Sequence, residues 1–216
     1  MTSQFNKVIH GTDPAEFDVI LKHSRDVIES LKYSEFKTPT LLGSSTDIIY
    51  YEFFELPVRL DEEWKHDSLN DESFIAIGRM LSRIHRSLDI NLLHGDFVLH
   101  NIFFNLSQEI CVIDCHPPEV IGYNYHYLYG NQNLEMYLFL INLSSSYGLK
   151  SSIASPHRVR QAIKNFRSGY GWVSDKNALI LAMLRNYRIR RSGGFSILNA
   201  LAHLTIGLYF IVSSYE

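Results

Sequence analysis

A short stretch near the middle of the chain constrains the fold more than any other part of the sequence. An apolar pair leads into the tripeptide His94-Gly95-Asp96, and Asn101 follows five residues after its aspartate. The β-favouring run 102–104 and the apolar run 110–113 then lead to Asp114, thirteen residues after Asn101. This pattern predicts a polar loop followed by a hairpin of two short strands, with a second aspartate where the hairpin ends.

Two carboxylates and an amide at these spacings suit phosphoryl transfer. That reaction depends on positioned charges, which are a carboxylate at the acceptor hydroxyl and oxygen ligands for Mg²⁺. Asp96 can provide the first, and Asn101 and Asp114 can provide the second. The structural alternative is a turn in which these side chains only cap local backbone groups.

Together the tripeptide His94-Gly95-Asp96, Asn101 and the pair Ile113-Asp114 resemble the protein-kinase-like phosphotransferases of the aminoglycoside phosphotransferase and choline kinase type. The resemblance implies an α+β, protein-kinase-like, two-lobed fold. Its small N-terminal lobe would be residues 1–56, and its mainly helical C-terminal lobe would be residues 57–216, with the catalytic loop at 92–114.

The resemblance also assigns roles to individual residues. Asp96 would serve the acceptor hydroxyl, while Asn101 and Asp114 would hold Mg²⁺ on the phosphates of ATP. His94 and Gly95 would support the loop, with His94 bracing it through hydrogen bonds. The implied activity is transfer of the γ-phosphate of a nucleoside triphosphate to a hydroxyl of a small molecule.

The first quarter of the chain has the element order of a kinase-like N-lobe after its glycine loop. We expect a strand over 5–10, a helix to about Tyr33, and strands over 40–42 and 47–54. The resemblance then implies that four residues contact the nucleotide, and these are Lys7, Glu52, Glu55 and Leu56. An acid on the first helix should pair with Lys7, but spacing does not choose among Glu16, Asp26 and Glu29.

Three departures separate the chain from the family pattern. The loop reads Phe97-Val98-Leu99-His100 before its asparagine, and Asp114 is followed by Cys115-His116. Only six residues precede Lys7, so the strands and glycine-rich loop that normally cover ATP are not in this sequence. We therefore expect weak, metal-dependent nucleotide binding. A non-catalytic pseudokinase module and a protein kinase remain alternatives to the small-molecule enzyme.

A zinc site is a further alternative, because four side chains with zinc-binding chemistry lie in one region. These are His94, Asp96, His100 and His116. The kinase-like interpretation is preferred because a zinc site would leave Asn101 and Asp114 unexplained.

The rest of the chain predicts a mainly helical structure. Helical segments are expected over 61–67, from Asn70 to His85, and over 133–147, 156–170, 176–191 and 195–212. The second of these should bury its apolar residues, namely Phe74, Ile77, Leu81, Ile84 and Leu88. His85 is expected to be a packed structural histidine.

Charge is distributed unevenly along the chain. The net charge is −3, yet ten Lys and Arg residues and only two acids follow residue 149. A polycationic aminoglycoside needs an acidic site, so we expect a neutral or anionic acceptor such as a sugar or a surface-glycan intermediate. No nucleic-acid partner is expected.

The last helical segment, Phe195–Val212, is nearly all apolar and follows a basic run at 188–191. It is at the short limit for a membrane span and contains Asn199 and His203, so a buried helix is favoured and peripheral membrane contact stays open. Two cysteines without a disulfide framework, and an N-terminus without an apolar signal core, predict a cytoplasmic protein.

Overall fold

The computed structural model of the protein is α+β, with two small antiparallel sheets and a mainly helical second half. It describes residues 4–8, 14–45, 48–52, 58–87, 92–105, 107–115, 131–147, 149–171, 174–192 and 194–213. The strands are β1 (Gln4–Val8), β2 (Leu41–Ser44), β3 (Ile48–Glu52), β4 (Val58–Arg59), β5 (Ile102–Phe104) and β6 (Ile110–Val112). The helices are α1 (Pro14–Leu31), α2 (Leu60–Lys65), α3 (Asp71–His85), α4 (Gln132–Ser146), α5 (Leu149–Ala154), α6 (Pro156–Tyr170), α7 (Lys176–Ser192) and α8 (Ile197–Ser213).

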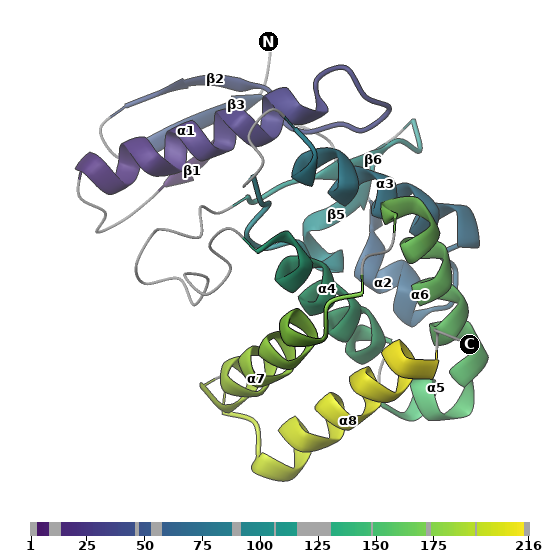
Figure 1. Ribbon diagram of the computed structural model, residues 1–216. Coiled ribbons are helices and arrows are strands. Elements are labelled where there is room, and N and C mark those ends of the chain that lie inside the picture. Colours follow the sequence, from purple (N-terminus) through teal and green to yellow (C-terminus); the bar gives the residue numbers. More distant parts are fainter. Residues whose placement is uncertain are drawn as a thin grey trace.

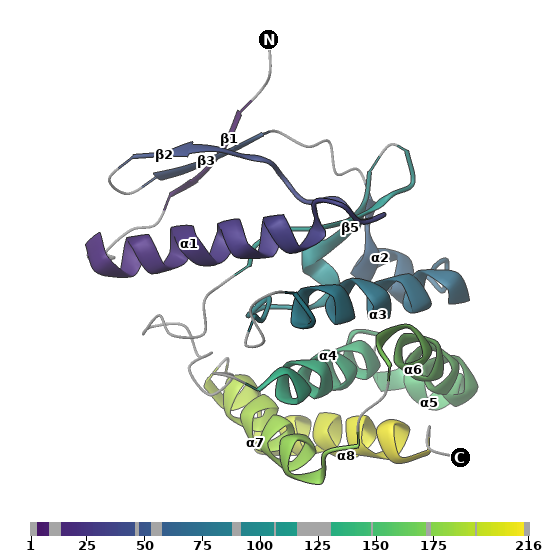
Figure 2. The ribbon, with the colours of Figure 1, turned by 45° about the horizontal axis from the view of Figure 1, so that its top comes forward.

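The N-terminal layer is a three-stranded sheet covered on one face by α1 (Figures 1 and 2). The strand order is β1-β3-β2, and both pairings are antiparallel. Residues of β3 alternate in burial, so that Ile49 and Tyr51 face the helix and pack with Phe17, Ile20 and Leu21. These residues form a small core that is separate from the main one.

A second sheet lies between this layer and the helices, with strand order β4-β5-β6. The β5–β6 hairpin is the one predicted from the sequence, and Phe103 pairs with Cys111 at its centre. The segment after α1 joins this sheet, because Lys37 donates to Ile110 O at 3.0 Å and accepts from Val112 N at 3.1 Å. The hairpin is therefore tied to both the N-terminal layer and the helices.

Helices α3 and α6 pack very closely. Asn70 caps α3 by accepting a hydrogen bond from Ser73 N at 2.9 Å, which places the start of the helix where the sequence predicts it. Gly78 on α3 lies against the backbone of Phe166, and Gly169 on α6 lies against the backbone of Ile75. A Cβ atom at either glycine would overlap a main-chain carbonyl, so both positions require glycine for this close approach.

Helix α4 lies in the centre of the helical part, with α6, α7 and α8 packed around it (Figure 2). All eight of its residues from Leu134 to Ile141 are buried, as expected for a helix covered on every side. The predicted apolar residues of α3 are also fully buried where the structure describes them, and Leu88 lies outside the described residues. Helix α5 was not predicted.

The prediction for the last helix is only half right. One side of α8 is buried, including Leu204 and Phe210, but Leu198 is 80% exposed and Tyr209 is 51% exposed. A nearly continuous apolar run hides which side faces the core, so the sequence could not separate the two sides. Among the described residues, no helix combines the length and apolar character needed to cross a membrane.

Candidate functional site

The predicted catalytic loop begins from a fully buried segment. Leu93 and His94 are both completely buried, and Gly95 adopts φ +89°. That conformation suits glycine, because a side chain there would be strained. The turn brings the following residue, Asp96, to a partly exposed position at the edge of the helical core.

Glu135, on the first turn of α4, holds this loop in place. Its carboxylate accepts hydrogen bonds from His94 N at 3.0 Å and from Gly95 N at 2.5 Å. It also accepts from His85 Nε2 at 2.8 Å, while His85 Nδ1 lies 2.7 Å from the Tyr170 hydroxyl. Glu135 is only 1% exposed, so three hydrogen bonds compensate for burying its charge.

Glu135 was not among the site residues predicted from the sequence. The only signal available was an acidic residue within an otherwise apolar helix. Burial alone would raise the pKa of its carboxyl group, but the hydrogen bond and charge of His85, together with the His94 side chain and backbone N–H, lower the pKa below its usual range. Glu135 is therefore a carboxylate that can accept all three bonds at neutral pH.

Asp96 and Asn101 lie in direct contact. Asn101 Nδ2 donates to the Asp96 carboxylate at 2.9 Å and to the Asp96 backbone carbonyl at 3.0 Å. Both acceptors are oxygens, which fixes the orientation of the amide and turns Asn101 Oδ1 away from Asp96. The short helical turn Leu99–Asn101 provides the geometry, because Asn101 N bonds Val98 O at 3.0 Å.

The hairpin brings Asp114 back to the same loop. Ile113 N donates to Asn101 O at 3.0 Å, so Asp114 follows one residue after a direct backbone contact with Asn101. Asp114 is exposed and has φ +62°, a conformation that an ordinary residue adopts at some cost in energy. The structure thus brings together the three polar residues that the sequence singled out.

The neighbourhood of Asp114 extends to the N-terminal layer. Cys115 Sγ lies 3.7 Å from Ser24 Oγ on α1. Burial raises the pKa of the Tyr51 hydroxyl, and the nearby Cys115 and Asp114 add to this effect. His23 Nε2 also lies 3.5 Å from His94 O. Helix α1 therefore contacts both ends of the predicted catalytic segment.

The donor chemistry of Asn101 and Asp114 fits Mg²⁺. This ion is commonly bound by one or two protein oxygen ligands together with substrate phosphates. One amide oxygen and one exposed carboxylate provide such a set. The described residues contain no cluster of three His, Cys, Asp or Glu side chains suited to a metal. His100 is exposed while His94 is fully buried, and His116 lies outside the described residues.

Residues predicted to contact the nucleotide are only partly described. Lys7 pairs with Ile49 in the sheet, but its side chain lies outside the described residues, as do Glu55 and Leu56. Glu52 ends β3 opposite Gln4, and its N–H donates to Thr40 O at 2.8 Å.

Two of the three candidate acids for pairing with Lys7 bind nearby lysines instead, one on α1 and one in the turn after it. Asp26 lies 2.5 Å from Lys22 Nζ, and Glu29 lies 3.2 Å from Lys32 Nζ. Neither ion pair involves the sheet that carries Lys7.

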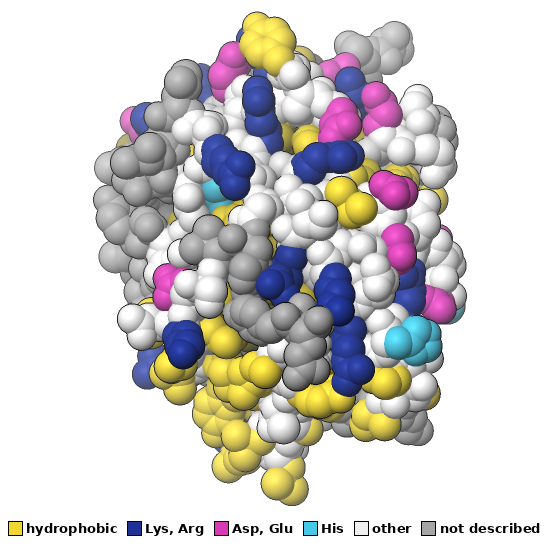
Figure 3. Space-filling model, turned by 45° about the vertical axis from the view of Figure 1, so that its right-hand side comes forward, with side chains coloured by type: hydrophobic (Ala, Val, Ile, Leu, Met, Phe, Trp, Pro, Cys, Tyr) yellow, Lys and Arg dark blue, Asp and Glu magenta, His cyan; other side chains and the backbone are white. Residues whose placement is uncertain are grey.

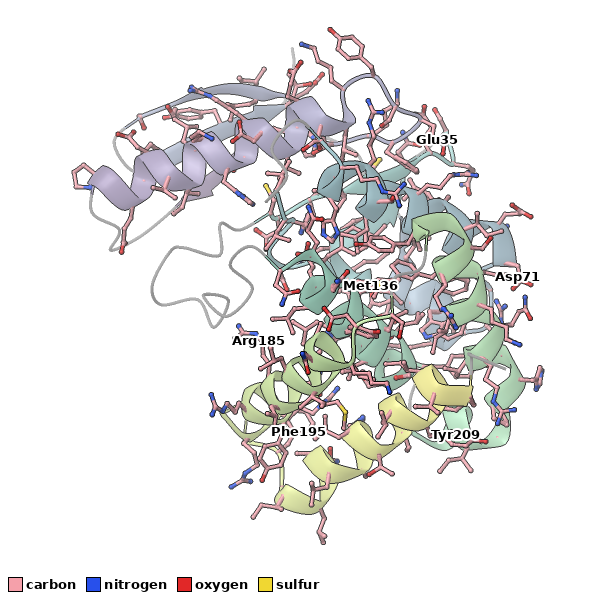
Figure 4. The ribbon with its side chains drawn as sticks, viewed as in Figure 1. Glu35, Asp71, Met136, Arg185, Phe195 and Tyr209 are labelled. Atoms are coloured by element: carbon pink, nitrogen blue, oxygen red, sulfur yellow. The ribbon has the colours of Figure 1, made fainter. Side chains whose placement is uncertain are left out.

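Several arginines that entered the prediction of an anionic acceptor have structural contacts. Arg158 binds Asp67 at 2.7 Å and Asp71 at 2.6 Å, and Arg190 donates to Asn186 and to Ser145. Arg185 is only 5% exposed and lies on α7, the helix that packs along α4 (Figure 4). The acceptor prediction therefore depends on the scarcity of acids in this half of the chain.

Comparison with known proteins adds no assignment: no family model matches the sequence, and no curated protein matches it.

Proposed function

We propose that the protein is a phosphotransferase with a protein-kinase-like, two-lobed fold, acting on a hydroxyl of a small molecule. The observation that carries the proposal is the contact between Asp96 and Asn101, with Asp114 following the residue that bonds Asn101 O. This arrangement joins a candidate base to two candidate metal ligands. The order of strands and helices before the loop, and the buried Glu135 that holds it, are further support.

In this proposal Asp96 positions the acceptor hydroxyl and accepts its proton. The hydroxyl oxygen forms a bond to the γ-phosphorus, while the bond from that phosphorus to the β–γ bridging oxygen breaks. The nucleoside diphosphate leaves with the bridging oxygen, and the proton passes from Asp96 to solvent. The hydrogen bond from Asn101 orients the Asp96 carboxylate for this role.

Asn101 and Asp114 are the residues that would hold Mg²⁺. The metal would supply charge stabilisation at the phosphates. Asn101 is 5% exposed and anchored by two hydrogen bonds, so its oxygen is held in a fixed orientation. Asp114 is exposed, so its carboxylate is accessible from solvent.

The proposed acceptor is a neutral or anionic sugar or glycan intermediate. From residue 150 onward the chain has ten basic residues and two acidic ones, Asp175 and Glu216. Asp175 is itself engaged, because it accepts hydrogen bonds from Ala178 N at 3.0 Å and from Asn133 at 3.2 Å. Few carboxylates are therefore left in this region to bind a polycation.

Transfer of radiolabelled phosphate from ATP to a panel of sugars, with kanamycin included, tests the proposal. We expect labelling of one or more sugars, and a loss of at least about hundredfold in rate for Asp96→Asn with the fold unchanged. Asp18→Asn, which alters an exposed carboxylate on α1, is the matched control and should keep full activity. Transfer by Asp96→Asn at the wild-type rate would refute the catalytic assignment, and labelling of kanamycin alone would refute the acceptor class.

A further inference from the structure

The outer side of the α7–α8 hairpin is apolar and exposed. Both helices pack on α4 and on each other, and each leaves a stripe of apolar side chains outside that contact. We call this surface the α7–α8 face, and its residues are Ile180, Leu181, Leu184, Ile197, Leu198 and Leu201, each at least 47% exposed. Figure 3 shows hydrophobic side chains gathered at the lower end of the molecule, where Figure 1 places the junction of α7 and α8.

The spacing of the exposed residues places them along one side of each helix. On α7 the exposed positions 177, 181, 184, 188 and 191 recur every three or four residues, which is one side of a helix, and exposed position 180 lies beside them. On α8 the exposed positions 198, 201, 205, 209 and 212 do the same. Phe195 lies where the two helices meet, and Tyr209 lies toward the far end of α8 (Figure 4).

Positive charge accompanies the apolar residues. Residues 176–213 contain five Lys and Arg residues and no Asp or Glu. Arg188 and Arg191 are exposed and continue the α7 stripe beyond Leu184. Arg190 lies with its guanidinium 5.6 Å from the centre of the Phe195 ring, so one cation also flanks the apolar end of the hairpin.

Exposed apolar surface of this kind is unusual on a protein that works alone in water, and it marks a contact surface. An apolar stripe beside cations, without acids, complements the interface of a bilayer that contains anionic lipids, where apolar side chains enter the headgroup region and cations bind the lipid charge. We infer that the α7–α8 face docks on an anionic membrane surface. The attachment is peripheral, and it does not depend on the reaction proposed at Asp96.

Flotation with lipid vesicles tests this inference. We expect the wild-type protein to bind vesicles of equal parts phosphatidylcholine and phosphatidylglycerol, and to bind phosphatidylcholine vesicles much less. Leu198→Asn should weaken binding by about tenfold or more, because a leucine would no longer enter the interface. Arg188→Gln combined with Arg191→Gln should weaken binding by about fivefold for each charge, and added salt should weaken the wild type similarly.

Matched controls lie at the opposite end of the protein. Tyr33→Asn removes an apolar side chain that is 81% exposed after α1, and Lys22→Gln with Lys32→Gln removes two exposed charges from α1 and the turn after it. All of these should bind vesicles as the wild type does, and thermal unfolding should show that every variant is folded.

Any of three results would overturn the inference. Binding to neither kind of vesicle, or equal binding to both, would contradict docking on anionic lipid. A wild-type dimer in analytical ultracentrifugation that becomes a monomer in Leu198→Asn, without vesicle binding, would instead assign the face to a second copy of the chain.

Discussion

Replacing Glu135 should destabilise the protein severely, and the structure gives the size of the effect. The carboxylate is 1% exposed and accepts three hydrogen bonds, two of them from the backbone of the predicted catalytic loop. Glu135→Gln keeps the shape but replaces one acceptor oxygen with an NH₂ group. At least one buried backbone N–H of His94 or Gly95 then faces another donor.

An unsatisfied buried donor costs about 1–3 kcal/mol, and the bonds that remain lose the strengthening given by the carboxylate charge. We therefore expect Glu135→Gln to lower the free energy of unfolding by about 2–4 kcal/mol. Glu135→Ala leaves all three donors unpaired. We expect the resulting loss in the free energy of unfolding to approach the total stability of a typical domain, which is about 5–15 kcal/mol.

Urea unfolding followed by tryptophan fluorescence measures this effect, because Trp64 is fully buried in the main core. The Glu135→Gln midpoint should fall by about 1 M or more for a typical dependence of stability on urea. Glu72→Gln is the control, since its carboxylate is exposed on α3. A loss below about 0.5 kcal/mol in Glu135→Gln, the range of ordinary surface substitutions, would refute the role assigned to this side chain.

Two further predictions concern pH and helix packing. The pKa of Glu135 is lowered in the folded protein, so its contribution to the free energy of unfolding is present above the carboxyl pKa of the unfolded chain, about 4.3, and is lost as pH falls through the lower folded value. Urea unfolding from pH 7 to pH 3 should therefore show a steeper loss of stability for the wild type than for Glu135→Gln. Equal slopes would contradict this. Gly78→Ala should cost about 3 kcal/mol of stability by forcing α3 and α6 apart, because the added Cβ overlaps the carbonyl of Phe166. Gly43→Ala is the control, because a Cβ there meets open space and should cost little. Thermal unfolding compares the two variants, and equal melting temperatures would refute the packing argument.

Elements with strong end signals were predictable from the sequence. Asn70 caps α3 as expected, and α6 starts at Pro156 and ends before Gly171, a glycine with φ +82°. The loop and hairpin that bring Asp96, Asn101 and Asp114 together were also predictable, because apolar strands of fixed length separate them.

Features that depend on tertiary packing could not be predicted from the sequence. A single glutamate in an apolar helix looks like a solvated side chain until the loop that it binds is placed beside it, which is why Glu135 was missed. The exposed stripe of α8 was missed for a related reason, since a helix that is apolar on every side carries no periodic signal of its orientation.

Calorimetric titration with ATP tests the central claim most directly, because the proposed reaction requires nucleotide held through metal at Asn101 and Asp114. We predict binding in the presence of Mg²⁺ that disappears when EDTA removes the metal and is strongly weakened in Asp114→Ala. Asp18→Ala, an exposed aspartate on α1, should bind as the wild type does. Binding that is equally tight in EDTA, or no binding under any of these conditions, would contradict the assignment, and the second result would favour a non-catalytic binding module.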